Sequence, residues 1–381
     1  MKVADYVLNH LENEGVKHVF VVNGAANAIL IDAFYRNKKV KHIAVMHEQA
    51  GGFVAEGYAK ISENLGVAFV TSGPGAQNLV TPISNFYFDS VPGLFISGQV
   101  NSNFLRPEPE IRQVGFQESP TVELVSPVTK YAKMITNPSS IKYELEKATF
   151  LAKEGRPGPV LLDIPINIQK SEIIPESLEG FNPLSYQGGY DSYLVDEKIR
   201  VYLDDLKNAK RPVILVGAGV RHSKGIEELL HAGKKLKIPM FPTWNALDIV
   251  TSDYEYYGGR VGTYGGKGRN FGIQNSDLLL AIGSRISGRI TGGKPESFAR
   301  EAKKYVVDID KYLLQRKTQQ VPFDESILCD AKVFLDRMNL KLDSMGSIPD
   351  FSEWNGKVFE WRDKYDPVLK EYYGEKEFAN P

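Results

Sequence analysis

The chain has 381 residues, of which 42% are hydrophobic and 24% are charged, and this ordinary composition excludes a disordered or collagen-like protein. Its 46 Lys and Arg residues nearly balance its 47 Asp and Glu residues, so no bulk charge points to nucleic acid or an anionic membrane as a partner. The length predicts roughly two or three domains. No apolar run approaches the roughly 18–20 residues that span a bilayer, the N-terminus lacks a signal-peptide pattern, and the single cysteine, Cys329, fits a cytoplasmic protein.

The first 170 residues alternate between helical and strand patterns. Val3, Val7, Leu8 and Leu11 recur at helical spacing, and helices are also expected through Phe34 and over 48–61. Short apolar runs that are typical of buried strands occupy 18–22, 42–46, 66–70, 94–97 and 159–164. This alternation predicts a parallel sheet with helices on both faces.

Residues 171–194 interrupt the pattern, because Pro, Gly, Ser and Tyr occur there without a period, and they are expected to form a linker. A second alternating unit is expected over 195–345, with strands at 212–216, 239–241, 278–282 and 305–307. Residues 346–381 are expected to form a helical, polar segment whose aromatic side chains pack. The sequence therefore predicts an α/β protein with two Rossmann-like parallel-sheet domains.

Four segments of the first unit follow predicted strands, at 23–26, 47–49, 71–78 and 97–99. Ligands of open α/β sheets bind at the carboxyl ends of the strands. Each segment alone has a simpler explanation, since a glycine after a strand is usually a turn and Glu48 could be an ordinary acid at a helix start. Together they bring a carboxylate, a glycine-rich loop and two amides to one edge, which favours a ligand site.

These segments also resemble a known family. His47-Glu48-Gln49, followed by the AEGYA segment at 55–59, is similar to thiamine diphosphate enzymes of the acetolactate synthase type. The resemblance extends through 71–75, 96–100, 116–118 and 155–160, and the segments at 271–277 and 283–285 resemble the family's central domain.

The resemblance implies that the first unit, residues 1–170, binds the aminopyrimidine ring of thiamine diphosphate. Glu48 matches the catalytic glutamate, whose proton shared with N1′ favours the imino form that deprotonates C2 of the cofactor. This role requires a partly desolvated carboxyl. His47 is expected only to support the loop. The implied cofactor-binding residues are Gly24, Ala25, Glu48, Thr71, Pro74 and Asn78, and the implied substrate residues are Gln99, Phe116 and Gln117. Without the family, Phe116 is equally well explained as a buried loop aromatic.

The segment Gly217-Ala218-Gly219 follows a predicted strand and precedes a helix, but it is only a fragment of a dinucleotide-binding motif. The resemblance implies an FAD with a structural role in this domain, whose Arg285 and Arg289 could clamp a pyrophosphate. The segment around Gly288 is smaller and less acidic than the flavin-binding pattern, so FAD, another nucleotide and a vestigial pocket all stay open. The matching positions are Gly217, Ala218, Gly219, Thr243, Gly262, Thr263, Tyr264, Gly283, Ser284, Arg285, Arg289, Asp308 and Asp310.

The family's third domain, which holds the cofactor's diphosphate through Mg²⁺, carries a GDG motif that this sequence lacks. We therefore expect Mg²⁺ to be held by a diphosphate-binding domain in a longer chain or a separate polypeptide. We assign no metal to this chain and expect it to be inactive alone. A homodimer or homotetramer is expected, because the family's site lies between two subunits.

The predicted function is decarboxylation of a 2-keto acid, with pyruvate as the expected substrate, followed by carboligation to a carbonyl acceptor, as in acetolactate synthase. The alternatives are a 2-keto acid decarboxylase, a carboligase that modifies a keto-sugar, and a non-catalytic nucleotide-binding protein. Fold analogy alone cannot choose among them.

Overall fold

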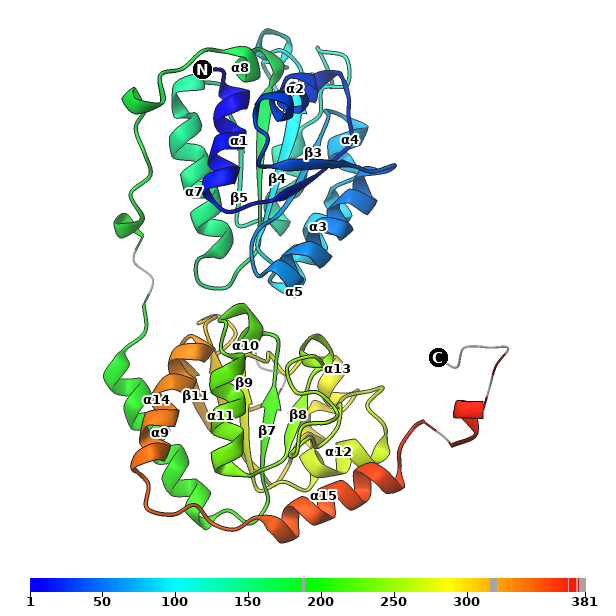
Figure 1. Cartoon of the computed structure of the whole chain (residues 1–381), viewed down its shortest axis with the longest axis vertical. Helices are drawn as coiled ribbons and strands as arrows, with labels where there is room; N and C mark the ends of the chain where they lie inside the picture. The colour runs from blue at the N-terminus through cyan, green and yellow to red at the C-terminus, as the bar shows by residue number, and fades with distance from the viewer. Residues whose placement is uncertain (187–188, 316–320, 369, 375, 377–381) are drawn as a thin grey trace. The chain divides into compact units, whose positions relative to one another are not determined.

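The structure, a computed structural model, describes all residues except 187–188, 316–320, 369, 375 and 377–381. It divides into two compact units, Met1–Gly188 and Gly189–Pro381 (Figure 1). Each unit is a separate body with its own sheet and core. Parts of the expected linker at 171–194 and of the expected C-terminal segment at 346–381 lie outside the described residues.

The first unit is built on a six-stranded sheet of order β2-β1-β3-β4-β6-β5, in which all neighbours pair in parallel. The central strands β3, β4 and β6 are buried along their whole length, as expected for a parallel sheet covered on both faces. The strands are β1 (His18–Val21), β2 (Lys41–Ala44), β3 (Gly66–Val70), β4 (Gly93–Gln99), β5 (Tyr131–Met134) and β6 (Pro159–Pro165).

Successive strand residues point to opposite faces, and each face of this sheet has its own apolar core. On β3, Val67 and Phe69 belong to one core, whereas Ala68 and Val70 belong to the other. The first core packs against α1 (Val3–Asn13), α2 (Ala28–Arg36), α7 (Ile141–Lys153) and α8 (Ile166–Lys170). The second packs against α3 (Glu48–Ser62), α4 (Pro74–Gln77) and α5 (Val80–Asp89) (Figure 1), and also against α6 (Thr121–Val125).

The second unit has a five-stranded parallel sheet of order β11-β10-β9-β7-β8. Its strands are β7 (Pro212–Val216), β8 (Met240–Pro242), β9 (Leu278–Ile282), β10 (Lys303–Asp308) and β11 (Glu325–Leu328). One face packs against α9 (Ser192–Asn208), α10 (Gly219–His222), α11 (Ile226–Leu236) and α14 (Ala331–Ser344). The other packs against α12 (Lys267–Gln274), α13 (Gly288–Thr291) and α15 (Ser352–Lys364).

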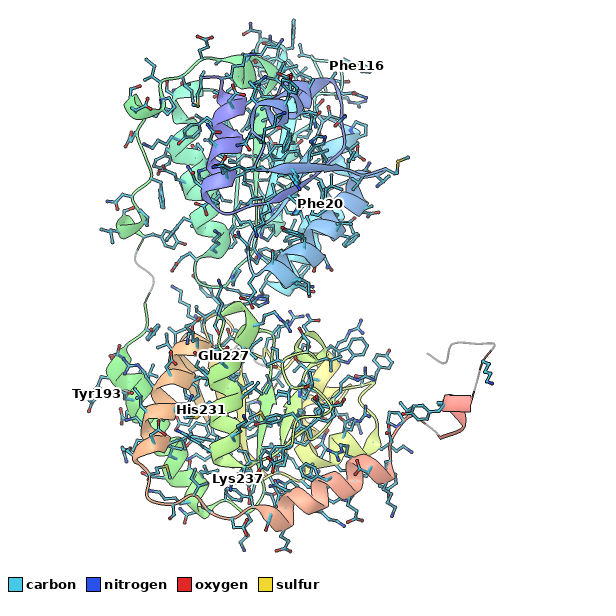
Figure 2. The ribbon with its side chains drawn as sticks, viewed as in Figure 1. Phe20, Phe116, Tyr193, Glu227, His231 and Lys237 are labelled. Atoms are coloured by element: carbon cyan, nitrogen blue, oxygen red, sulfur yellow. The ribbon has the colours of Figure 1, made fainter. Side chains whose placement is uncertain are left out.

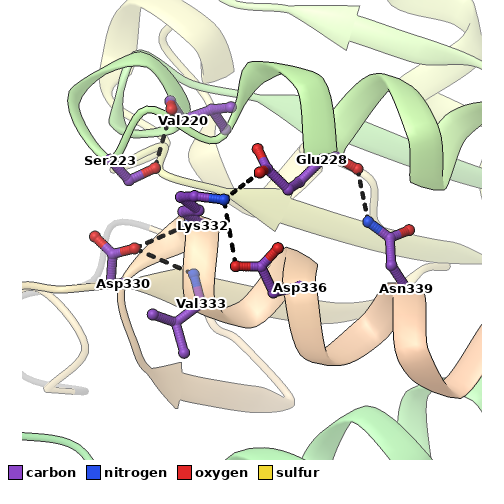
Figure 3. A network of polar contacts seen from close by, with 8 residues as sticks. All are labelled: Val220, Ser223, Glu228, Asp330, Lys332, Val333, Asp336 and Asn339. Carbon is purple, nitrogen blue, oxygen red and sulfur yellow. Dashed lines mark hydrogen bonds and ion pairs between the residues drawn. The ribbon is translucent and has the colours of Figure 1, made fainter.

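Polar contacts join α14 to α11 in this unit (Figure 3). Asp330 caps α14 by accepting hydrogen bonds from the amides of Lys332 at 2.9 Å and Val333 at 3.2 Å. The Lys332 ammonium pairs with Glu228 on α11, and Asn339 donates a 3.0 Å hydrogen bond to the carbonyl of Glu228. Local capping and the packing of the two helices therefore reinforce each other.

The structure confirms the predicted α/β class with two parallel-sheet domains. The sequence analysis missed β5 and β11, which are edge strands of the two sheets. Their residues are mostly half-buried or exposed, so no continuous apolar run marks them. None of the helices in the described part of the chain is long and apolar enough to cross a membrane.

Candidate functional site

The candidate site lies where β2, β1, β3 and β4 end. These strands are neighbours in one parallel sheet, so the segments that follow them share one edge. The segment after β2 leads to Glu48, the first residue of α3. The turn after β1 contains Gly24, the loop after β3 begins at Thr71, and β4 ends at Gln99. The fold thus gathers the four segments that the sequence analysis assigned to one edge.

Glu48 is half-buried and is joined to the loop after β3. Asn78 Nδ2 donates a 2.9 Å hydrogen bond to Glu48 Oε2. His47 precedes the helix, and its Nδ1 accepts a 3.2 Å hydrogen bond from the amide of Gln49. His47 therefore supports the start of α3, and the structure brings Glu48 and Asn78 into direct contact.

The turn after β1 rests on Thr71. The Thr71 hydroxyl oxygen accepts a 3.2 Å hydrogen bond from the amide of Ala26. A Cβ atom at Gly24 would lie only 2.4 Å from the Cβ of Thr71. Since real Cβ atoms essentially never approach another atom so closely, this close packing requires glycine at position 24. Ala25 lies in the same turn and is exposed.

A second glycine keeps space beside the acid. A Cβ atom at Gly75 would lie 2.9 Å from Thr71 Cγ2 and 3.3 Å from Glu48 Oε1. Pro74 begins the short helix α4, which leads from this point to Asn78. Five of the predicted cofactor residues, counted with Glu48, thus lie in contact or in adjoining turns: Gly24, Glu48, Thr71, Pro74 and Asn78.

The three predicted substrate residues lie in different environments. Phe116 is 85% exposed and lies at the periphery of the first unit (Figure 2), so it is not the buried loop aromatic that the residue type alone suggests. Gln117 is exposed and has a left-handed φ of 60°. Its backbone packs against Gly73, where a Cβ atom would lie 2.8 Å from the carbonyl oxygen of Gln117. The loop of Gln117 is therefore seated on the loop after β3.

Gln99, which the sequence analysis expects to line the reaction centre, is fully buried in this chain. Its Nε2 donates hydrogen bonds to the carbonyl of Ser119 at 3.0 Å and to Asp163 Oδ2 at 2.9 Å. Its Oε1 accepts a 2.9 Å hydrogen bond from the amide of Val100. The Gln99 side chain therefore contacts the backbone at both ends of the loop of residues 100–119.

Sequence reasoning missed two buried polar residues, Asp163 and Gln169. Gln169 Nε2 donates 2.7 Å hydrogen bonds to the carbonyls of Ala26 and Ile164. Ala26, in the turn after β1, is therefore bonded to Gln169 through its carbonyl and to Thr71 through its amide. A Cβ atom at Gly98 would lie 2.1 Å from the carbonyl oxygen of Ala26. The sequence does hold a signal for both residues. Asp163 interrupts the apolar run of β6 and Gln169 follows it closely, and a polar side chain that is buried needs a hydrogen-bond partner.

The predicted nucleotide residues of the second unit also follow adjacent strand ends. The turn after β7 crosses the turn after β9, because a Cβ atom at Gly217 would lie 2.0 Å from the carbonyl oxygen of Gly283. At Gly219 it would lie 2.6 Å from the Cα atom of Gly283. These glycines allow the backbones of the two turns to approach each other closely. Thr243 follows β8, Ala218 lies between the two glycines of the β7 turn, Ser284 and Arg285 follow β9, and Asp308 and Asp310 lie at and beyond the end of β10.

Trp244 forms an aromatic surface at this edge that the sequence analysis did not single out. Its ring lies 5.7 Å from the centroid of the Tyr264 ring. The guanidinium carbons of Arg260 and Arg289 lie 5.7 and 5.6 Å from the centroid of the Trp244 ring. Arg260 Nε is buried and has no hydrogen-bond partner. Gly262 and Thr263 adjoin Arg289, since Thr263 N donates a 2.9 Å hydrogen bond to the Arg289 carbonyl.

The fold and site define a two-domain α/β protein with a carboxylate-bearing site at the sheet edge of its first domain. Residues 1–123 match the family model of the thiamine pyrophosphate enzyme N-terminal TPP binding domain, and residues 199–338 match that of the thiamine pyrophosphate enzyme central domain. The chain belongs to the thiamine pyrophosphate enzymes, which confirms the resemblance drawn from its motifs.

Acetolactate synthases are among its curated relatives. The chain is 35% identical over 375 residues to acetolactate synthase 2, chloroplastic, of Brassica napus, with 98% of the chain and 57% of the relative covered. It is 36% identical over 361 residues to the acetolactate synthase large subunit of Corynebacterium glutamicum, with 93% and 55% covered. It is 33% identical over 365 residues to the acetolactate synthase large subunit of Lactococcus lactis, with 95% of the chain and 61% of the relative covered. The chain spans about half the length of the curated relatives it matches.

Proposed function

We propose that the chain supplies the aminopyrimidine side of a thiamine diphosphate site in an enzyme that decarboxylates a 2-keto acid and ligates the product to a carbonyl acceptor. Pyruvate is the proposed 2-keto acid, by analogy with the acetolactate synthases. The observation that carries the proposal is the Glu48 carboxyl, which is held by Asn78 at the glycine-lined edge of the first sheet.

The residues present fit the aminopyrimidine ring. Asn78 occupies Oε2 of Glu48, so Oε1 is free of that bond, and Gly75 leaves room beside it. Thiamine diphosphate, when bound, supplies the nucleophile and the electron sink of the reaction. Glu48 holds and returns a proton at Oε1, and the turn containing Gly24 and Ala25 lets the backbone approach the ring. Partial burial strengthens the hydrogen bond that such a carboxyl makes.

The loop of residues 100–119 is proposed to close the substrate side. Its two ends are tied to Gln99, its Gln117 packs against Gly73, and the preceding residue, Phe116, is exposed. The exposed Phe116 ring offers an apolar surface that excludes water once a substrate or a partner domain covers it. Gln99 then acts through the loop rather than on the substrate.

The second unit is proposed to hold a nucleotide, with FAD as the ligand that the family resemblance implies. The indole of Trp244 with the guanidinium groups of Arg260 and Arg289 suits a flat ring and an attached diphosphate. The protein purified with its flavin should show a flavin absorption spectrum that is lost with Trp244→Ala. Absence of flavin, and no binding of added FAD, would contradict this assignment.

Mg²⁺ and the diphosphate are proposed to be held by a domain outside this chain's two units. A homodimer or homotetramer through the first unit is also proposed. It is supported by large apolar side chains exposed on α3 and α5, among them Phe53, Val54, Tyr87 and Phe88. Burial of such a patch favours association. A purely monomeric protein in sedimentation would contradict it.

The function is tested with the chain supplied with a diphosphate-binding domain, in the same or a separate polypeptide, together with thiamine diphosphate, Mg²⁺ and pyruvate. We expect CO₂ release that depends on thiamine diphosphate, together with a ligated product. Aldehyde as the sole product would favour the decarboxylase alternative, and a branched sugar formed only with a keto-sugar acceptor would favour a sugar-modifying carboligase. No CO₂ release from any 2-keto acid would leave the non-catalytic nucleotide-binding alternative.

A further inference from the structure

Asp163 is a fully buried carboxyl on β6 that the proposed function does not use. It is aligned with Ser97 on β4, which is also fully buried. Ser97 Oγ donates a 2.7 Å hydrogen bond to Asp163 Oδ1, and Gln99 Nε2 donates a 2.9 Å hydrogen bond to Asp163 Oδ2. Both carboxyl oxygens act as acceptors, which is the pattern of an ionised carboxylate.

Gln99 connects this carboxylate to both ends of the loop of residues 100–119. Its Oε1 accepts from the amide of Val100 at the first end, and its Nε2 donates to the carbonyl of Ser119 at the last. Because Val100 requires the amide oxygen, the NH₂ group must face Ser119 and Asp163. One side chain thus fastens both ends of the loop, and Asp163 fixes its orientation.

The loop between these ends has an internal fold of its own. Glu118 accepts hydrogen bonds from the amides of Arg106 at 2.7 Å and Val114 at 2.9 Å. The backbone of Gln117 packs against Gly73. These contacts connect the last end of the loop to its interior and to the Gly73 turn.

We propose that Asp163 is a positioning residue: in its ionised form it holds Gln99 so that residues 100–119 are fastened against the Gly73 turn, and in its protonated form it holds them less firmly. The catalytic importance of this loop rests on the proposed function. The fastening itself does not, because it is a property of the chain without cofactor.

The surroundings of Asp163 place its titration near neutral pH. Burial raises the pKa of Asp163 to about 7, although the hydrogen bonds from Ser97 and Gln99 oppose the rise, and the charge of Glu123 on α6 adds to it. Glu123 is itself largely exposed and lies 3.8 Å from Arg106. On β5 the residue aligned with Asp163 is Met134, and its neighbour Lys133 is exposed. Hydrogen bonds to an ionised acceptor are roughly twice as strong as neutral ones.

The test is amide hydrogen exchange of the 381-residue chain without cofactor, in wild type and Asp163→Asn, at pH 5.5 and 8.5. The asparagine keeps the shape and lacks the charge at both pH values. We expect peptides within residues 100–119 to exchange about fivefold to tenfold faster in the variant at pH 8.5 and equally in both proteins at pH 5.5. Peptides from β9 in the second unit serve as the internal control.

Two results would overturn the proposal. Equal exchange of the loop in both proteins at pH 8.5 would show that Asp163 does not fasten it. A difference of the same size at both pH values would show a structural role without any dependence on charge. Since no cofactor is involved, either result is separable from a failure of the decarboxylation assay.

Ser97→Ala supplies a second variant, which is informative even where Asp163→Asn does not fold. It keeps the carboxyl but removes a hydrogen bond to its ionised form, which raises the pKa of such a group. The pH midpoint of loop protection should therefore move upward relative to wild type. An unchanged midpoint would contradict the proposal.

Discussion

Single residues at the edge of the first sheet set its geometry, and Gly24 is the clearest case. A Cβ atom there would lie 2.4 Å from Thr71 Cβ, so Gly24→Ala must displace either the turn or Thr71. Overpacking of this kind costs about 1–3 kcal/mol. Urea unfolding of the first unit should show that loss in the free energy of unfolding.

Gly57→Ala is the matched control, because nothing lies within 4 Å of a Cβ at this helical position in α3. It should stabilise the unit by about 0.5–1 kcal/mol. Equal effects of the two substitutions would contradict the tight packing between Gly24 and Thr71.

Asp163 also predicts how stability depends on pH. Since burial raises its pKa from 3.8 to about 7 in the folded protein, the folded state binds its proton more tightly than the unfolded state does. Its contribution to the free energy of unfolding is therefore fully present below about pH 3.8, decreases as the pH rises above that value, and is lost as the pH passes through 7. Between pH 5 and 8, wild type should lose about 2–3 kcal/mol relative to Asp163→Asn. If the free energies of unfolding of wild type and Asp163→Asn change with pH in parallel across this range, the pKa of Asp163 is not raised.

At the scale of elements, the Asp330 carboxyl caps the N-terminus of α14, next to Lys332, which pairs with Glu228 on α11. Asp330→Ala removes the acceptor for the amides of Lys332 and Val333, which should cost about 1 kcal/mol in the free energy of unfolding of the second unit. Asp330→Asn keeps a capping oxygen and should remain near wild type. If the two variants lose the same stability in urea unfolding, the cap is not the cause.

The central elements of both sheets could be predicted from sequence because burial on two faces produces continuous apolar runs. The run of Val67, Ala68, Phe69 and Val70 in β3 is one example. The edge strand β5 could not be predicted, since Tyr131 to Met134 lie half-buried or exposed. Its pairing with β6 depends on a neighbour that is distant in sequence.

At the scale of the whole molecule, the candidate site is assembled from loops whose contacts no local pattern specifies. The sequence motifs predicted that Glu48 and Asn78 share a site, and the 2.9 Å hydrogen bond between them lies there. The support by Asp163 and Gln169 was missed because a polar residue in a buried strand shows its role only through its partners. The same limit applies to Gln99, whose motif suggested the reaction centre while its hydrogen bonds run to the loop.

Glu48 is proposed to exchange the proton on which thiamine diphosphate chemistry depends. The most direct test of this role is the turnover of pyruvate by the Glu48→Gln chain supplied with its diphosphate-binding domain, with thiamine diphosphate and Mg²⁺ at saturation. Glu63→Gln, at the C-terminal cap of the same helix, is the matched control. We predict that Glu48→Gln lowers turnover by roughly 10²–10⁴-fold without unfolding the protein, and that Glu63→Gln leaves it unchanged. Turnover near the wild-type value in a folded Glu48→Gln protein would contradict the claim.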